Sequence, residues 1–135
     1  MNKRVFALIA SFLLAIGCSG QRPHGKASTM TYTVATQDEL NAGNQRINEF
    51  KQELLKKGFR EVSSFSSDSK EQSILEGRYG ALKDLKVTLW TGNRLDMKGP
   101  QLGGGVDASI VSKEAEQEFD ELYKRVVSVV VGERP

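Results

Sequence analysis

The stretch that decides the fold is Leu85-Lys86-Val87-Thr88-Leu89-Trp90, in which large apolar and polar residues alternate up to the final Trp. Side chains of a β-strand point alternately to the two faces of a sheet, so the pattern assigns Leu85, Val87 and Leu89 to a buried face. Trp90 then falls on the other face. The alternation predicts a sheet covered on one side and open on the other, with an aromatic side chain on the open side.

Three further stretches have the length and composition of strands: Phe59–Phe65, Ser73–Tyr79 and Val106–Val111. Segments rich in Ser, Asp, Gly and Lys separate the first two from their neighbours and are typical of turns. Met30–Ala35 is short and rich in β-forming residues, so it is expected to form a first strand.

Two helices flank these strands. The segment Thr36-Gln37-Asp38-Glu39 is a capping box, and Leu40, Ile47, Phe50 and Leu54 then recur at helical spacing up to Gly58. Ser112 likewise precedes two acidic residues, and Ala115, Phe119, Leu122, Val126 and Val130 share one helical face. The valine-rich end of this segment would suit a strand by itself. Because no helix-breaking residue precedes it, the helix is expected to reach Val131, with Gly132 as its C′ residue and a terminal strand as the alternative.

The predicted order is therefore (β)-α-β-β-β-β-α. This order indicates the α+β class: a two-layer sandwich in which an antiparallel sheet of three to five strands carries two long helices on one face. Residues 30–135 are expected to form this single small domain.

The charge of the chain belongs mostly to its first segment. The 135 residues hold 19 Lys plus Arg against 17 Asp plus Glu, and the two excess cations, Lys3 and Arg4, lie within the first 17 residues. A remainder that is formally neutral has no field to concentrate around phosphate backbones, which argues against nucleic-acid binding. The single Cys excludes an intramolecular disulfide and a cysteine-clustered metal site.

The N-terminal segment predicts export. Lys3 and Arg4 precede Val5–Gly17, an uncharged run of 13 residues. A helix of that length covers about 20 Å, short of a bilayer core of roughly 30 Å, so residues 1–17 are expected to be a signal peptide.

The run Ala15-Ile16-Gly17-Cys18 resembles the lipobox of a bacterial lipoprotein precursor. The resemblance implies a diacylglycerol on the Cys18 thiol, cleavage before Cys18, and an N-acyl chain such as palmitate on the new terminus. Ser19 in the second mature position implies the outer membrane, facing the periplasm. Ala15-Ile16-Gly17 also fits ordinary signal peptidase, which would release a soluble periplasmic protein with a free Cys18.

Residues 18–29 are predicted to be the lipidated N-terminus and a flexible tether. Ser19–Thr29 consists mainly of Gly, Ser, Pro and basic residues, with Ala27 as its one apolar side chain. His24 is the only His of the chain and falls in this tether, where it is poorly placed to act as a buried general base.

The long connection Gly92–Gly105 draws attention because irregular connections of this length are often functional or disordered. Its glycine-rich end, Gly99–Gly105, has neither the spacing nor the following helix of a phosphate-binding loop, so a flexible loop is expected. Arg94, Leu95 and Met97 give the connection one cationic and two apolar contacts. Together with Trp90 they are the candidate partner-binding residues.

No catalytic constellation is visible in the sequence. Glu76, Asp84, Asp96 and Asp107 are the acids near strands or the long connection, and spacing alone does not pair them. The chain is expected to need no metal and no cofactor beyond its own acyl chains, because no calcium-binding acidic pattern is present.

These features predict a membrane-anchored periplasmic lipoprotein that acts as a non-enzymatic binding or accessory module for an envelope protein or complex. The alternatives are an exclusion or immunity lipoprotein, a lipid- or glycan-binding carrier, and a carboxylate-based envelope hydrolase.

Overall fold

The computed structural model describes residues 23–68, 70–92 and 100–132. Its elements follow the order β2 (His24–Thr33), α2 (Gln37–Lys56), β3 (Arg60–Ser66), β4 (Lys70–Glu76), β5 (Lys83–Gly92), β6 (Gln101–Ile110) and α3 (Lys113–Val131). The five strands form one antiparallel sheet in the order β2-β6-β5-β4-β3. The predicted two-layer α+β sandwich with the order β-α-β-β-β-β-α is confirmed.

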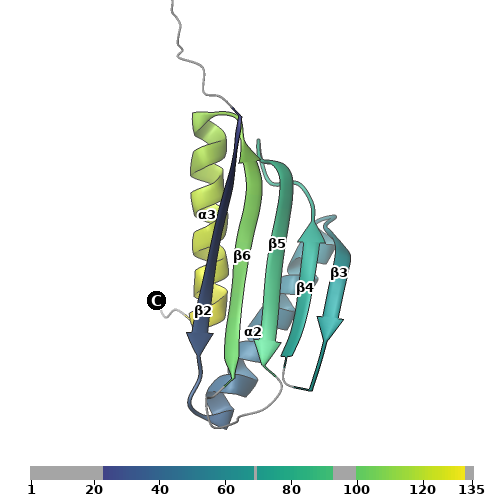
Figure 1. The fold of residues 1–135 in the computed structure, drawn as a ribbon, viewed down its shortest axis with the longest axis vertical. Coiled ribbons are helices and arrows are strands. Elements are labelled where there is room, and N and C mark those ends of the chain that lie inside the picture. Colours follow the sequence, from purple (N-terminus) through teal and green to yellow (C-terminus); the bar gives the residue numbers. More distant parts are fainter. Residues whose placement is uncertain (1–22, 69, 93–99, 133–135) are drawn as a thin grey trace, which may run out of the picture.

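Both helices cover the same face of the sheet. In Figure 1 they lie behind the strands, with α3 along β6 and β2 and α2 along the other half of the sheet. Among the described ranges, no helix or strand covers the opposite face. The name "open face" is used below for this second side of the sheet.

The core lies between the sheet and the helices. All five apolar positions predicted for the second helix are buried in α3, and α2 buries the four predicted positions together with Gly43. Leu85, Val87 and Leu89 are at most 2 % exposed, as their alternation predicts. Apolar burial of this kind contributes about 25 cal/mol per Å2 of surface removed from water, which makes this layer the main source of stability.

The helix ends follow the predicted capping. The Glu39 amide donates to the Thr36 hydroxyl oxygen, and the Ala35 amide donates to the Glu39 carboxylate, so each side chain caps a free backbone group. At the other end of the chain, Gly132 adopts a left-handed conformation with φ of 73° and its amide donates to Ser128. This confirms that the valine-rich segment is helical to Val131.

Arg46 of α2 joins the two helices. Its guanidinium donates to the Val129 carbonyl at 2.8 Å and to the Val130 carbonyl at 3.1 Å. These carbonyls belong to the last turn of α3, where a cation also compensates the negative end of the helix dipole.

The first strand begins earlier than predicted. β2 pairs with β6 along its whole length, from His24 opposite Ile110 to Thr33 opposite Gln101. The prediction of a tether extending to Thr29 is therefore wrong for residues 24–29. The strand is held by backbone pairing and by contacts to α3: Lys26 forms ion pairs with Glu116 and Asp120, and the Tyr123 hydroxyl donates to the Thr29 carbonyl.

The glycine-rich segment is a strand, which corrects the expectation of a flexible loop up to Gly105. Gln101–Gly105 forms the first half of β6, which lies between β2 and β5 in the sheet. Close packing explains the glycines: a Cβ at Gly103 would lie 2.2 Å from the Trp90 ring and 2.5 Å from the Met30 carbonyl oxygen. On the helix side, a Cβ at Gly104 would lie 2.8 Å from Val126 of α3. Of the rest of the predicted connection, Gly92 ends β5 and Pro100 is buried, and residues 93–99 lie outside the described residues.

A substitution in this strand tests the close packing. Gly103→Ala is expected to lower the free energy of unfolding by about 1–3 kcal/mol, because the added methyl group must displace the Trp90 ring or the backbone of β2. The matched control is Gly25→Ala in β2, where a Cβ would have no atom within 4 Å. Urea unfolding followed by Trp fluorescence measures both variants. Equal effects of the two substitutions would contradict the packing.

Candidate functional site

Trp90 lies on the open face, as predicted. It is directly opposite Gln72 of β4 and Gly103 of β6 in the pairing register, and its side chain is half-buried. The missing Cβ of Gly103 leaves room for the indole, and the Lys70 ammonium lies 5.6 Å from the centre of the ring. An aromatic ring held on both sides is pre-ordered for contact, because little side-chain freedom remains to be lost on binding.

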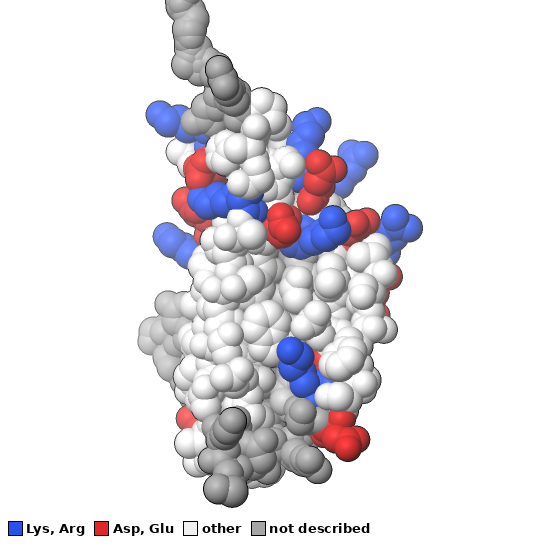
Figure 2. Space-filling model, in the orientation of Figure 1, with Lys and Arg blue, Asp and Glu red and all other residues white. Residues whose placement is uncertain are grey.

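The centre of the open face carries uncharged residues. Directly opposite residues in antiparallel strands point to the same side, so the register assigns two rows of side chains to this face. From β3 to β2 they are Phe65, Gln72, Trp90, Gly103 and Thr31 in one row, and Ser63, Ile74, Thr88, Gly105 and Thr29 in the next. Figure 2 shows the uncharged area, with most of the charged side chains gathered toward one end of the face.

A β-bulge brings Phe65 to the open face. Phe59 packs in the core at 4 % exposure, and Phe65 would share its side in a regular strand because the two are six positions apart. The register shifts between Glu61 and Ser63, which reverses the side to which the following residues point. Phe65 is consequently 55 % exposed and lies in the same row as Trp90. The alternation in the sequence gave no sign of this shift.

A row of alternating charges bounds this uncharged area. Arg60, Glu76, Lys86 and Asp107 lie opposite one another on β3, β4, β5 and β6. The Glu76 carboxylate is 3.7 Å from both the Arg60 guanidinium and the Lys86 ammonium. A charged border beside an uncharged centre fits a protein-binding surface, whose rim is usually polar.

The structure does not bring the candidate catalytic acids together. Glu76 and Asp107 lie on the two strands that flank Lys86, about 10 Å apart by the usual spacing of strands. Asp84 accepts a hydrogen bond from Ser109 at 3.3 Å and has a positive φ of 53°. Asp96 lies outside the described residues, as do Arg94, Leu95 and Met97 of the predicted partner-binding set and Cys18 of the lipid attachment site.

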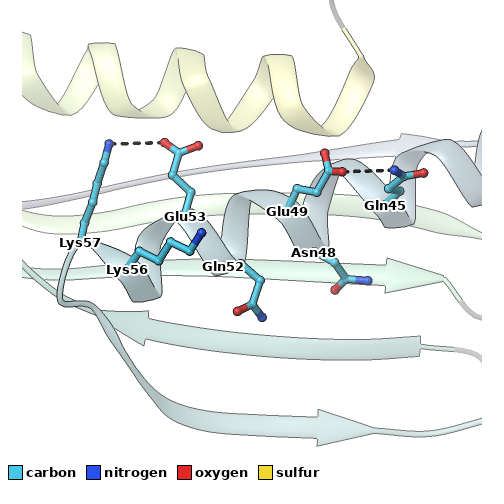
Figure 3. A pocket seen from close by; sticks show the side chains of 7 residues that line it. All are labelled: Gln45, Asn48, Glu49, Gln52, Glu53, Lys56 and Lys57. Atoms are coloured by element: carbon cyan, nitrogen blue, oxygen red, sulfur yellow. Dashed lines mark hydrogen bonds and ion pairs between the residues drawn. The ribbon is translucent and has the colours of Figure 1, made fainter.

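A shallow depression of about 690 Å3 follows the outer surface of α2. It is lined by Gln45, Asn48, Glu49, Gln52, Glu53, Lys56 and Lys57. Figure 3 shows that these side chains diverge: Glu49 and Glu53 point toward α3, whereas Asn48 and Gln52 point to the other side of the helix. Groups that do not converge on one point form no binding site for a small molecule.

A smaller cleft of about 280 Å3 lies between the two helices, and we call it the interhelical cleft. Its floor is apolar and consists of Phe50, Leu54, Phe59 and Leu122, and Glu53 and Arg125 stand at its rim. The Arg125 guanidinium donates to Glu53 at 2.7 Å and lies 5.1 Å from the centre of the Phe50 ring.

Two groups around the interhelical cleft have shifted pKa values. Burial raises the pKa of Glu53, but the hydrogen bond from Arg125 and the charges of Arg125 and Lys57 outweigh it, so its pKa is lowered overall. Burial raises the pKa of the Tyr79 hydroxyl, and the nearby carboxylates of Glu121 and Glu118 raise it further. The cleft thus keeps Glu53 ionised and Tyr79 neutral at neutral pH.

In the described part of the chain, no three His, Cys, Asp or Glu side chains are grouped so that they could hold a metal ion. No helix in that part is long and apolar enough to cross a membrane.

No protein-family model matches the chain, and no curated protein matches it.

The Glu53 ion pairs predict a pH-dependent contribution to stability. A lowered pKa means that folding favours the carboxylate, so the contribution is complete above the pKa of the unfolded chain and is lost as pH falls through the folded-state pKa. Glu53→Gln is expected to lower the free energy of unfolding at neutral pH by about 0.5 kcal/mol, and this loss is expected to shrink as pH falls through the folded-state pKa of Glu53. Urea unfolding at neutral pH and at a series of acidic pH values measures this. Glu49→Gln, one turn earlier on α2, is the control; an equal loss in that variant, or a loss that persists in acid, would contradict the assignment.

Proposed function

We propose that this protein is a periplasmic lipoprotein, attached through Cys18 to the outer membrane, that binds another protein or complex of the bacterial envelope without catalysing a reaction. The observation that carries the proposal is the open face. Trp90 and Phe65 lie in an uncharged area of that face, with the charged row from Arg60 to Asp107 on one side.

The chemistry of the open face suits a protein partner. Aromatic side chains at the centre of an interface contribute most of the binding energy, and surrounding polar groups exclude water and fix the register. Here Trp90 supplies the anchor, and Thr29, Thr31 and Thr88 supply hydroxyl groups around it. The two uncharged rows around Trp90 contribute no residue to the depression on α2 or to the interhelical cleft, which favours a protein surface over a small molecule as their ligand.

The lipobox-like run ending at Cys18 supports attachment to a membrane. Acyl chains contribute about 0.8 kcal/mol per buried methylene group, and two or more chains give stable anchoring. The folded part therefore needs no apolar membrane-binding helix. With the acyl chains on Cys18, the domain stands at the membrane surface, where an envelope protein can reach its open face.

The interhelical cleft supports a second candidate, a carrier of a small apolar ligand. Its apolar floor and polar rim resemble a ligand pocket, although its volume of about 280 Å3 is at the lower limit for a drug-sized molecule. Such a ligand would be small, with an apolar group over Phe50 and Leu122.

Acylation is the first experimental test. Cys18→Ser is expected to abolish incorporation of labelled palmitate and to leave the precursor uncleaved, because the modified Cys is required before cleavage of a lipoprotein. Metabolic labelling and the electrophoretic mobility of the mature chain measure both effects. Normal maturation of Cys18→Ser would show that ordinary signal peptidase cleaves the chain and that the protein is not anchored by lipid.

Site-specific photo-crosslinking in intact cells tests the open face. A photoreactive amino acid at Phe65 is expected to form an adduct with one envelope protein, whereas the same amino acid at Gln52, on the outer surface of α2, is expected to form none. Trp90→Ala should then reduce the Phe65 adduct at least about 10-fold, since loss of a central aromatic anchor typically costs about 2 kcal/mol or more. Circular dichroism of Trp90→Ala serves as the folding control. Adducts of equal yield at both positions would contradict docking on the open face.

A further inference from the structure

A cleft of about 500 Å3 lies at the end of the sheet where α2 ends and β5 begins, and we call it the end cleft. It is lined by residues from the end of α2, the start of β3, the β4–β5 connection and the start of β5. They are Lys57, Gly58, Arg60, Glu76, Gly77, Arg78, Asp84, Leu85 and Lys86. Four of these residues are cations and two are acids, so the lining has an excess of positive charge in a chain whose exported part is formally neutral.

The cations of the end cleft are only loosely paired. Arg60 and Lys86 share the single Glu76 carboxylate at 3.7 Å each, longer than the 2.7–2.9 Å of a close charged hydrogen bond. Lys57 pairs at 3.3 Å with Glu53, which lies outside the cleft. Among the residues that the structure describes, Arg78 makes no ion pair and is exposed. A phosphate in the cleft would gain charged hydrogen bonds from Arg78 and Arg60 without displacing a buried pair.

The carboxyl end of α2 does not oppose an anion as strongly as a bare helix end would. The amides of Lys57, Gly58 and Phe59 donate to the carbonyls of the last turn, Glu53, Leu54 and Leu55. These bonds satisfy the groups that carry the negative end of the helix dipole.

The end cleft lies at the same end of the sheet as the point where the chain enters. The register places Ala27 of β2, four residues into the domain, in one row with Lys86, Glu76 and Arg60. Six residue-to-residue steps join Cys18 to His24, and they span at most about 22 Å when fully extended. An acylated Cys18 therefore holds this end of the sheet close to the membrane surface.

Two segments at the opposite end of the domain have an excess of acidic residues. Among the described residues, the start of α2 and the β3–β4 hairpin carry Asp38, Glu39, Asp68 and Glu71, against the single cation Lys70. In Figure 2, blue and red side chains alternate near the end from which the N-terminal segment leaves the domain. The positive charge that matches the anionic surface of a phospholipid membrane is therefore that of the end-cleft lining, with four cations against two acids.

We propose that the end cleft binds the phosphate groups of anionic phospholipids in the membrane that carries the Cys18 anchor. The location of the membrane rests on the proposed lipid anchor, but the binding itself requires only the folded domain. Arg78 and Arg60 contact the headgroup phosphate, and Lys57 and Lys86 add charge around it. The strands then stand upright on the bilayer, and the open face is directed sideways.

The test uses the mature chain from residue 18 with Cys18→Ser, which contains every described element but no acyl group. Binding is measured by sedimentation with vesicles of phosphatidylglycerol and phosphatidylcholine, and with vesicles of phosphatidylcholine alone. Arg60→Gln combined with Arg78→Gln is expected to lower the partition coefficient on the anionic vesicles roughly 25-fold, about 5-fold for each cation. The control, Lys70→Gln combined with Lys124→Gln, removes the same charge away from the cleft and should change binding less than about 2-fold.

Three results would overturn the proposal: equal binding to both kinds of vesicle, equal losses in the two double variants, or no loss in the Arg60/Arg78 variant. Soluble glycerol phosphate, followed through the Gly77 and Arg78 amide signals by NMR, distinguishes the source of the phosphate. Millimolar affinity supports the membrane, whereas micromolar affinity would assign the cleft to a soluble phosphate compound. None of these measurements depends on acylation, so failure of the lipid anchor and failure of the end cleft are separate outcomes.

Discussion

The close packing of α3, β2 and the Trp90 ring around Gly103–Gly105 is the constraint on which the rest of the structure depends. A side chain at Gly103 would collide with the Trp90 ring, one at Gly104 with Val126 of α3, and one at Gly105 with Thr29 of β2. Without side chains here, α3 packs close against β6, and the indole of Trp90 packs on Gly103 at the open face. Glycine in a strand costs backbone entropy, so this strand is stable only because its neighbours pack so closely on it.

The same constraint explains why the Trp90 side chain lies on the open face and is nevertheless held in place by its neighbours. Its ring occupies the space that the absent side chain of Gly103 leaves, and the Lys70 ammonium lies 5.6 Å from the centre of the ring. An exposed aromatic on a flexible loop would lose conformational freedom on binding, whereas this one has already lost it on folding. The glycines of β6 therefore determine the packing of both the core and the open face, and a substitution at one of them is expected to affect both sides of the sheet.

Most of the fold could be predicted because its signals are local. The alternation from Leu85 to Trp90, the capping box at Thr36 and the five apolar positions of α3 each report a conformation of the segment that carries them. β2 could not be predicted to begin at His24, because its small polar residues show no local strand signal; pairing with β6 and the ion pairs of Lys26 with α3 make it a strand. The glycines of β6 wrongly predicted a flexible loop, because the contacts that order them come from distant segments. Glycine is flexible in an isolated peptide, but here it allows neighbouring side chains and strands to pack closely.

In the candidate site, too, local sequence signals predicted some features and long-range strand pairing determined the others. The position of Trp90 on the open face followed from alternation, but the presence of Phe65 beside it depends on the bulge between Glu61 and Ser63, a property of pairing with β4. Likewise, no pattern in the sequence joins Lys57, Arg60, Arg78 and Lys86, which come from four segments and meet only because α2 ends where β3 begins and β4 turns into β5. Surfaces assembled from several strands require the register, and the register is a long-range property.

The two proposed surfaces together restrict the partner. Strands of ten residues extend about 33 Å, and the link from Cys18 adds at most about 22 Å. Every point of the open face therefore lies within roughly 55 Å of the bilayer when Cys18 is acylated. With the end cleft on the headgroups, the link need not be extended, and the face approaches the membrane further. A protein that binds Trp90 must then present its own binding surface in this narrow layer. That requirement favours a partner embedded in, or attached to, the same membrane over one that diffuses freely through the periplasm.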